Sequence, residues 1–357
     1  MVGINKYSGK GYDNKGNMKN GNLVSIIIPN FNSSKTISKC LDAIFSSDYK
    51  NFEIIIVDDK STDNCLETIK NYPVRLIKNK KNLGAAYSRN AGAKSAKGEI
   101  LVFIDSDVVV KKDTLGRILD DFKKMPYIGA VQTIYSHKCR FKNPSSQYKA
   151  MYNHYSFSCN KSKFIPTIAS YCSAVKKKVF DKIGGFDANM IKSYSEDDEF
   201  GYRLVAHNYK IYFDKSIEVE HLAYFSMKKT LKRDFKMGKD AIKTLLRNKN
   251  KEFVNLANKK QFATNINLNV ILSILLSLPL MLSLIILMFY PNAYSFVFFL
   301  LLNIMMVIIN LKFLFFILSK KNVFYMATGY FIHLLSMMFV ALGIIFGIFE
   351  FALGRRY

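Results

Sequence analysis

The segment Glu99–Val110 limits the fold more than any other part of this chain. It begins with Ile100–Ile104, an unbroken apolar run that is typical of a strand buried on both faces of a mainly parallel sheet. Asp105, Ser106 and Asp107 follow directly. Two carboxylates at this spacing, at the end of a buried strand, can hold a divalent cation together with a diphosphate. The same residues also suit an ordinary turn, so the spacing alone leaves both interpretations open.

Two other apolar runs end in polar clusters in the same way. Leu23–Ile28 is followed by PNFN at 29–32, and Phe52–Val57 is followed by DDKSTD at 58–63. Segments with helical spacing of apolar residues lie between the runs, which predicts βαβ units and a parallel sheet. Ligands of such sheets bind outside the carboxyl ends of the strands. Three consecutive strands with polar ends therefore favour a ligand site over unrelated turns.

The composition indicates a basic domain joined to a membrane segment. Half of the 357 residues are apolar, yet the formal net charge is +25, and a single soluble domain rarely combines these values. Anionic lipid headgroups and nucleotide phosphates both attract such a charge. No nucleic-acid-binding motif accompanies it, so we expect no nucleic-acid partner. The five cysteines are scattered and form no CxxC pair, which predicts no disulfide framework or zinc site and fits a reducing cytoplasm.

Three apolar runs near the C-terminus are long enough to cross a bilayer. They are Leu268–Phe289, Tyr294 to about Leu318, and Val323–Phe349. Before them, Met227–Leu246 combines an apolar stripe with a basic face, as in helices that lie on anionic membranes, and packing on the preceding domain is the alternative. The predicted organisation is a flexible tail (1–22), an α/β domain (23–225), a basic interfacial helix with a linker (226–262) and a transmembrane region of about three helices (263–357).

The charges that flank the apolar runs predict their orientation. Lys259-Lys260 and Lys320-Lys321 favour the cytoplasmic side, which fits an out-and-back path for the first two runs. A third full crossing would place Arg355-Arg356 outside, against the positive-inside tendency. Either the last segment is partly re-entrant or the tendency is overridden, and three spans is the interpretation that we favour.

Six segments between residues 22 and 225 form a characteristic set. They are SIIIPNFN (25–32), IIVDDKSTDN (55–64), NLGAAYSRNAG (82–92), FIDSDV (103–108), KIGGFD (182–187) and SEDDEFGYRL (195–204). In this order they resemble the family 2 glycosyltransferases, which have the GT-A fold, a Rossmann-like α/β fold with a mainly parallel sheet. The resemblance implies an inverting enzyme that uses a nucleotide-diphosphate sugar as donor.

The resemblance also implies the residues that bind the nucleotide sugar. Pro29 and Phe31 stand where the family packs the base, although an ordinary core position is the alternative for Phe31. Asp59 matches the acid that accepts an N–H of a uracil-type base, which implies a UDP-linked donor, whereas Asp58 is expected to brace the loop. The other implied residues are Asn82, Gly84, Arg89, Asp105 and Ser106. For Arg89, a phosphate contact and a solvated helix charge are both open.

The metal site implied by the resemblance uses Asp107 as its first ligand, with Asp105 and His221 as further ligands. His221 follows the strand-like run Lys210–Glu220, and a purely structural histidine is the alternative there. The implied cofactor is Mn²⁺ or Mg²⁺, because either ion neutralises the charge that develops on the leaving diphosphate.

The acidic cluster Ser195–Phe200 contains the implied catalytic base. The dipole of a helix favours acids in its first turn, which explains one or two of them, but four in a row repel one another. The resemblance matches Glu196-Asp197 to the acidic pair of the family, whose Asp takes the proton of the acceptor hydroxyl. Asp197 is therefore the predicted base, Glu196 and Asp198 are predicted on the acceptor side, and Asp198 is the alternative base.

These features predict a multi-pass, cytosol-facing membrane enzyme that moves a single sugar to a membrane-associated acceptor, such as a lipid-linked saccharide, for envelope glycan or polysaccharide synthesis. Processive synthases of the cellulose and hyaluronan type carry a QxxRW motif. Lys232–Phe235 stands at the corresponding place without it, and the chain has no tryptophan, which disfavours processive polymerisation. The alternatives are a polyprenyl-phosphate glycosyltransferase and a catalytically silent nucleotide-sugar-binding scaffold. The aromatic residues of Gly129–Phe164 are expected to be core rather than sugar-stacking residues.

Overall fold

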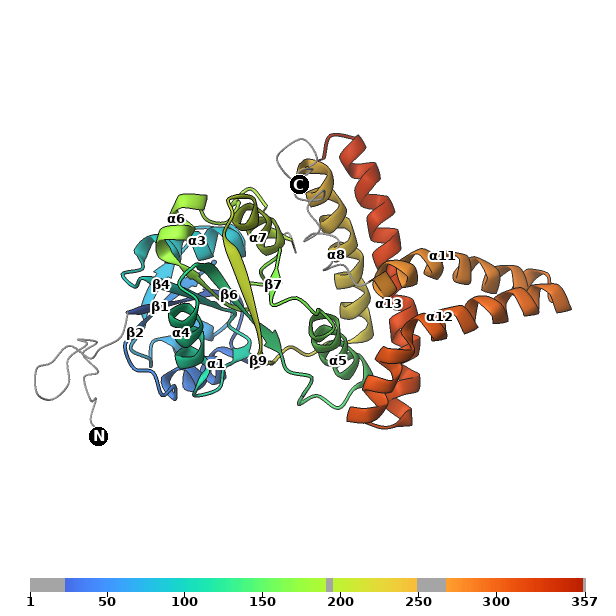
Figure 1. Cartoon of the computed structure of the whole chain (residues 1–357), viewed down its shortest axis with the longest axis horizontal. Coiled ribbons are helices and arrows are strands. Elements are labelled where there is room, and N and C mark those ends of the chain that lie inside the picture. Colours follow the sequence, from blue (N-terminus) through green and yellow to red (C-terminus); the bar gives the residue numbers. More distant parts are fainter. Residues whose placement is uncertain (1–22, 191–194, 249–267, 356–357) are drawn as a thin grey trace, which may run out of the picture. The chain divides into compact units, whose positions relative to one another are not determined.

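The computed structural model describes residues 23–190, 195–248 and 268–355 (Figure 1). The predicted tail and most of the predicted linker lie outside these residues. The chain divides into two compact units. One, here called the α/β unit, comprises Met1–Ile134, Lys163–Lys192 and Glu196–Leu222, and the other, the helical unit, comprises Tyr135–Ser162, Ser193–Ser195 and Ala223–Tyr357.

The α/β unit is built on a nine-stranded mixed sheet in the order β3-β2-β1-β4-β8-β6-β9-β5, with β7 paired to β9. The four strands at one end are parallel to one another: β1 (Val24–Asn30), β2 (Phe52–Asp58), β3 (Arg75–Lys78) and β4 (Ile100–Ile104). The rest of the sheet is antiparallel and contains β5 (Val108–Val109), β6 (Ile128–Tyr135), β7 (Phe164–Ile165), β8 (Cys172–Lys176) and β9 (Lys210–His221). The prediction of a mainly parallel α/β domain is therefore confirmed.

The helices of this unit cover the sheet and join its strands. They are α1 (Ile37–Phe45), α2 (Cys65–Ile69), α3 (Ala85–Ser95), α4 (Thr114–Lys124), α6 (Lys177–Ile183) and α7 (Glu196–Ala206). Gly92 of α3 lies so close to β1 that a Cβ atom there would stand 2.5 Å from Cγ2 of Ile27. The absence of a side chain thus lets α3 pack tightly on the sheet, which fixes the loop that precedes this helix.

Strand β1 continues two residues beyond the predicted run. Pro29 and Asn30 pair with Val57 and Asp58 of β2, whereas the pairing of β1 with β4 ends at Ile27. A proline is tolerated here, although β1 is a central strand, because β4 no longer pairs with β1 at that point.

The helical unit contains α5 (Pro144–Ser158), α8 (Met227–Asn248), α11 (Leu268–Phe289), α12 (Ala293–Lys320) and α13 (Val323–Ala352). Within the described residues, the last three are long and apolar enough to cross a membrane, at nearly the predicted boundaries. The expectation that the aromatic residues of Gly129–Phe164 are core residues is confirmed for Tyr148 of α5, which is buried. The core that it joins is formed with α12 and α13 rather than with the sheet.

Helix α8 packs along α13 with very close backbone contact. The glycines at this contact are Gly238 on α8 and Gly343 and Gly347 on α13. A Cβ on Gly343 would collide with the carbonyl oxygen of Phe235, and a Cβ on Gly238 with that of Val340. Small residues that let two backbones approach are typical of helix pairs in membrane proteins. The sequence suggests the membrane surface, or alternatively the preceding domain, as the partner of α8. The structure shows α8 packed against α13.

A single methyl group should loosen this helix pair. We expect Gly343→Ala to lower the free energy of unfolding by about 1–3 kcal/mol, because the neighbouring backbone carbonyl has to move. Gly329→Ala on the same helix is the matched control, since its new Cβ would meet only the flexible Cδ1 end of Ile317, at 3.0 Å. Thermal unfolding of the full-length protein in detergent measures both variants. Equal melting temperatures for the two would contradict the close contact.

Candidate active site

Asp58 braces the first loop of the site. Its Oδ1 accepts hydrogen bonds from Asn30 Nδ2 at 2.8 Å and from Ser61 Oγ at 2.6 Å. The backbone N–H of Ser61 donates to its Oδ2 at 3.2 Å. The carboxyl ends of β1 and β2 are thus tied together by side chains that are buried. This arrangement agrees with the predicted bracing role.

Asp59 organises the second loop, between β3 and α3. Its Oδ1 accepts from Asn79 Nδ2 at 2.9 Å and from the N–H of Leu83 at 2.8 Å, and its Oδ2 accepts from the N–H of Gly84 at 2.8 Å. Gly84 has φ of 88°, a left-handed conformation that favours glycine. An ionised carboxylate has about four acceptor positions. These three bonds leave room for a ligand N–H, so base recognition by Asp59 stays a prediction.

The predicted base-packing residues lie at the surface of the unit. Phe31 is 50% exposed, so the alternative of an ordinary core position is wrong for it. Pro29, Asn82 and Ser106 are half-buried. An exposed aromatic ring at the carboxyl end of β1 is available to stack on a ligand ring.

Arg89 joins two acids that are far apart in the sequence. Its side chain is 4% exposed, Nη2 donates to Asp105 Oδ1 at 2.9 Å, and Nη1 donates to Glu196 Oε1 at 3.0 Å. The guanidinium carbon lies 5.6 Å from the ring centroid of Phe186. The interpretation of Arg89 as a solvated helix charge is therefore wrong. Both terminal nitrogens are committed to carboxylates rather than directed at a free phosphate position.

The sheet brings Asp107 and His221 together across 114 residues of sequence. Strand β5 pairs with β9 so that Val108 faces His221, and the N–H of Leu222 donates to the carbonyl of Asp107 at 2.7 Å. As a result, His221 Nε2 lies 3.3 Å from Asp107 Oδ2. The carboxylate oxygens suit Mn²⁺ or Mg²⁺ as a partial ligand set, to which His221 would add an imidazole nitrogen. Asp105 is the neighbouring carboxylate, with one oxygen held by Arg89.

The acids at the start of α7 lie in a partly buried environment. Asp197 Oδ2 accepts from the N–H and the hydroxyl of Ser170, at 3.1 and 3.2 Å, and its Oδ1 accepts from the N–H of Asp198 at 3.0 Å. Burial raises the pKa of Asp197, while the charge of Arg89 pulls it down. Burial, and next the charge of Asp197, raise the pKa of Glu196 to about 7. Burial also raises the pKa of Asp198 well above its ordinary value. A carboxylate with a raised pKa is a stronger base than an ordinary Asp.

The residues that hold Asp197 in place lie in the segment 166–174, which the resemblance matches as a whole to the lining of the donor and acceptor side without singling out a residue. Ser170 precedes β8, and the neighbouring N–H of Ala169 donates to Gln132 Oε1 at 2.6 Å. The hydroxyl of Tyr171 donates to the carbonyl of Thr133 at 2.8 Å. Strand β6 therefore fixes the loop that binds the predicted base. The polar residues of this loop give no local pattern that would single them out.

Arg203 fixes the other side of α7. It pairs with Glu199, Nε to Oε1 at 2.7 Å, and it donates to the carbonyl oxygens of Ile183 and Gly185 at 2.8 and 2.6 Å. The Gly-rich turn after α6 is held in this way, and its Phe186 exchanges two hydrogen bonds with Asn90 of α3. Helix α7 is thus anchored, through this turn, to α3, the helix that carries Arg89.

Comparison with known proteins agrees with this geometry. Residues 25–184 match the family described as Glycosyl transferase family 2. The chain is 29% identical over 203 residues to the "Poly-beta-1,6-N-acetyl-D-glucosamine synthase" of Staphylococcus epidermidis, a match that covers 54% of this chain and 48% of that protein. This chain thus spans about half the length of that relative.

A second relative and one solved structure share more of their length with this chain. The first is the "Dolichyl N-acetyl-alpha-D-glucosaminyl phosphate 3-beta-D-2,3-diacetamido-2,3-dideoxy-beta-D-glucuronosyltransferase" of Methanococcus voltae, 28% identical over 61% of this chain and 72% of that protein. The second is the mannosyltransferase PcManGT from Pyrobaculum calidifontis, solved in complex with GDP-Man and Mn²⁺. It has a TM-score of 0.54 and 16% identity, over 92% of this chain and 87% of that one, and it shows the fold.

The family match, the relatives and the fold agree with the geometry of the carboxyl strand ends. Residues 25–184 match glycosyl transferase family 2, and the α/β unit has the GT-A fold, followed in the same chain by long apolar helices.

Proposed function

We propose that this glycosyltransferase moves a single sugar, with inversion, from a nucleotide-diphosphate donor to an acceptor held at the membrane. The donor is a UDP-sugar, on the match of Asp59 to the acid that accepts an N–H of a uracil-type base. The acceptor is a lipid-linked saccharide, because a polyprenyl tail stays in the bilayer next to the anchoring helices while its headgroup reaches the α/β unit.

The observation that carries this proposal is the bridge made by Arg89. This buried side chain binds Asp105 on the donor side and Glu196 on the acceptor side, at 2.9 and 3.0 Å. Asp197, next to Glu196, is held by Ser170 on a separate loop. Arg89 thus links the proposed metal-ligating cluster to the start of the helix that carries the proposed base, which supports a single site for donor and acceptor.

The residues of this chain have distinct tasks in the proposed reaction. Asp197 accepts the proton of the acceptor hydroxyl as its oxygen attacks the anomeric carbon, opposite the departing diphosphate. Ser170 keeps the carboxylate of Asp197 oriented toward that proton. Asp107, His221 and Asp105 would hold Mn²⁺ or Mg²⁺, which neutralises charge on the leaving diphosphate. Phe31 stacks on the base of the donor.

Relatives support the acceptor class but differ in the number of transfers. One is named as a synthase of a polymer, and another is named for an acceptor on dolichyl phosphate. We propose single transfer for this chain, because the segment Lys232–Phe235 lacks the QxxRW motif of processive synthases. The products would serve envelope glycan or polysaccharide synthesis on the cytoplasmic side of a cell membrane.

Binding of a panel of nucleotide sugars to the full-length protein tests the donor site. With Mn²⁺ or Mg²⁺ present, we expect one UDP-sugar to bind, and EDTA or Asp107→Ala to weaken its binding about 10-fold or more. Asp113→Ala is the matched control, because this exposed acid pairs with Arg117 in the next turn of α4, at 3.4 Å. The absence of metal-dependent binding to every nucleotide sugar would reject the donor site and favour the scaffold interpretation.

A further inference from the structure

Helices α8 and α13 run side by side in the same direction (Figure 1). Their contacts advance together along both helices. The contacting pairs, from the N-terminal to the C-terminal end, are Asp234–Ser336, Gly238–Val340, Lys239–Gly347 and Lys243–Glu350. The contact therefore covers residues 336–350 of α13, which corresponds to about 21 Å of helix axis.

Helix α8 carries too much charge to accompany α13 through a bilayer. It contains eight lysines and arginines and two aspartates. Asp234 and Lys243 are buried against α13 and its neighbours, and Lys228, Lys229 and Lys232 are exposed. A charged residue near the bilayer centre costs about 2.5–3.5 kcal/mol on insertion scales. If α13 crossed the bilayer, either the charges of α8 would enter the hydrocarbon core or the contact between α8 and α13 would be lost.

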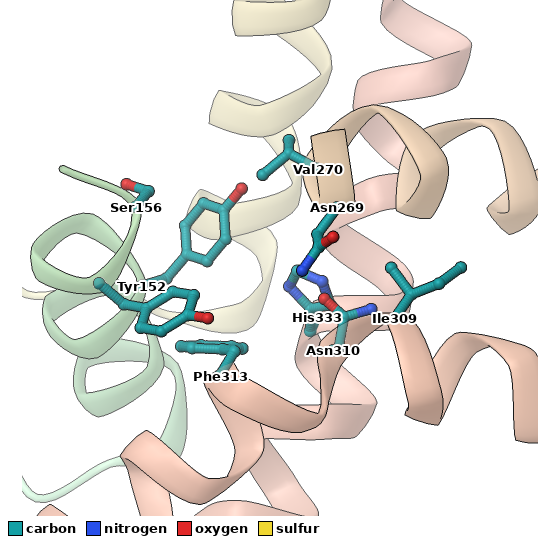
Figure 2. A pocket seen from close by; sticks show the side chains of 9 residues that line it. Tyr152, Ser156, Asn269, Val270, Ile309, Asn310, Phe313 and His333 are labelled. Atoms are coloured by element: carbon teal, nitrogen blue, oxygen red, sulfur yellow. The ribbon is translucent and has the colours of Figure 1, made fainter. Parts of the chain in front are cut away.

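Helix α12 crosses α13 instead of running along it. The contacts of Asn303, Phe313 and Ile317 span about 21 Å of the α12 axis, and they fall on Gly329–His333 of α13, about 6 Å of axis. Figure 2 shows this contact from close by: His333 of α13 lies beside Asn310 and Phe313 of α12 in the lining of a small cavity. In Figure 1, α11 and α12 project as a hairpin at a steep angle to the α8–α13 pair.

The hairpin has the dimensions and the surface of a membrane anchor. Helices of 22 and 28 residues are about 33 and 42 Å long, and the hydrocarbon core is about 30 Å thick. At the tip of the hairpin, Tyr290 and Tyr294 are 70% and 89% exposed. Tyrosines are enriched where a bilayer meets water. A hairpin that follows the membrane normal places the steeply inclined α13 close to the membrane plane.

We propose that only α11 and α12 cross the bilayer, and that α8 and α13 lie together in the interface of the leaflet on the side of the N-terminus. Exposed Phe331, Ile345 and Phe349 of α13 would enter the acyl boundary, and the exposed lysines of α8 would contact anionic headgroups. Two crossings keep Arg355-Arg356 on the same side as Lys320-Lys321, which agrees with the positive-inside tendency. This inference does not depend on the proposed function.

Protease access to epitope tags tests the number of crossings. The full-length chain receives a tag at the N-terminus, at the C-terminus, or between Tyr290 and Pro291 at the hairpin tip, and is digested in membrane vesicles of known sidedness. We expect the two terminal tags to be cleaved from the same face and the tip tag from the opposite face. A C-terminal tag that is cleaved together with the tip tag would establish a third crossing and overturn the proposal.

Because the chain contains no tryptophan, a single introduced tryptophan can report how deep a helix lies in the bilayer, which is a second test. Phe339→Trp lies near the middle of α13, and Leu282→Trp near the middle of α11 is the control for a spanning helix. Fluorescence is quenched with lipids brominated either near the headgroup or near the end of the acyl chain. We expect a shallow-to-deep quenching ratio above 1 for Phe339→Trp and below 1 for Leu282→Trp. Ratios below 1 for both would place α13 at the bilayer centre and overturn its interfacial position.

Discussion

Asp197→Asn should lower kcat by about 10²–10⁴ while the nucleotide sugar still binds. The substitution keeps the size of the side chain and an acceptor oxygen for Ser170, but the amide cannot take the proton of an acceptor hydroxyl. Because burial raises the pKa of Asp197, protonation removes the active form at a higher pH than for an ordinary Asp. The acid limb of the rate profile should therefore lie at a higher pH than an ordinary Asp would give, and it should be lost in the variant. Steady-state transfer assays across pH, together with donor binding, measure both effects.

Asp198→Asn is the matched control for this experiment. Its carboxylate is adjacent in sequence, but the bonds from Ser170 go to Asp197. A large loss in Asp198→Asn with near-normal activity in Asp197→Asn would move the base to Asp198. Substantial activity in both variants would instead favour a polyprenyl-phosphate acceptor, which is already anionic and needs no base.

Asp234→Ala should destabilise the helical unit by about 3–5 kcal/mol. Asp234 is 2% exposed, its Oδ1 pairs with Lys149 Nζ, and its Oδ2 accepts from the hydroxyl of Ser336 at 2.7 Å. Burial lowers the pKa of Lys149, and the attraction of Asp234 opposes this shift. Removing the carboxylate leaves a buried ammonium group without its counter-charge. Denaturant or thermal unfolding of the full-length protein in detergent measures the loss.

A double substitution tests whether the lost stability arises from the unpaired charge or from the packing of the side chains. Lys149→Met with Asp234→Leu should recover most of the lost stability, because two apolar side chains can replace a buried ion pair at little net cost. Glu67→Gln, which removes an exposed ion pair with Lys70 at 2.8 Å, should cost less than about 1 kcal/mol. A double variant as unstable as Asp234→Ala would show that the cost arises from packing rather than from the unpaired charge.

The strands and the donor-side clusters could be predicted from sequence because their signals are local. Apolar runs such as Ile100–Ile104 set the strands, and polar residues directly after them fall at one edge of a parallel sheet. The three apolar helices were predicted within a few residues for the same reason. Length and hydrophobicity are properties of a single segment.

The partners of side chains could not be predicted in the same way. Arg89 lies on a helix that is otherwise ordinary, and only the tertiary fold brings Glu196, 107 residues away, to its guanidinium. Ser170 and Gln132 have no motif around them. The sequence of α5 has polar residues on all sides, so it does not indicate which face is buried. In the structure its tyrosines pack against other helices, and Lys149 pairs with Asp234 of α8.

The sheet divides where its strands reach the site. Beyond Ile27, β1 continues only with β2, while β4 continues with β8 through Ile104 and the bond from Asp105 N–H to the carbonyl of Tyr171. One branch carries the loops proposed to read the nucleotide, and the other carries the acids and the loop that holds Asp197. The two branches are not joined by ladder hydrogen bonds at this point, so side chains couple them, and the bridge from Arg89 to Asp105 and Glu196 is one such coupling. We therefore expect donor preference to diverge, in evolution or by engineering, without loss of the transfer chemistry where substitutions leave α3 and Arg89 in place.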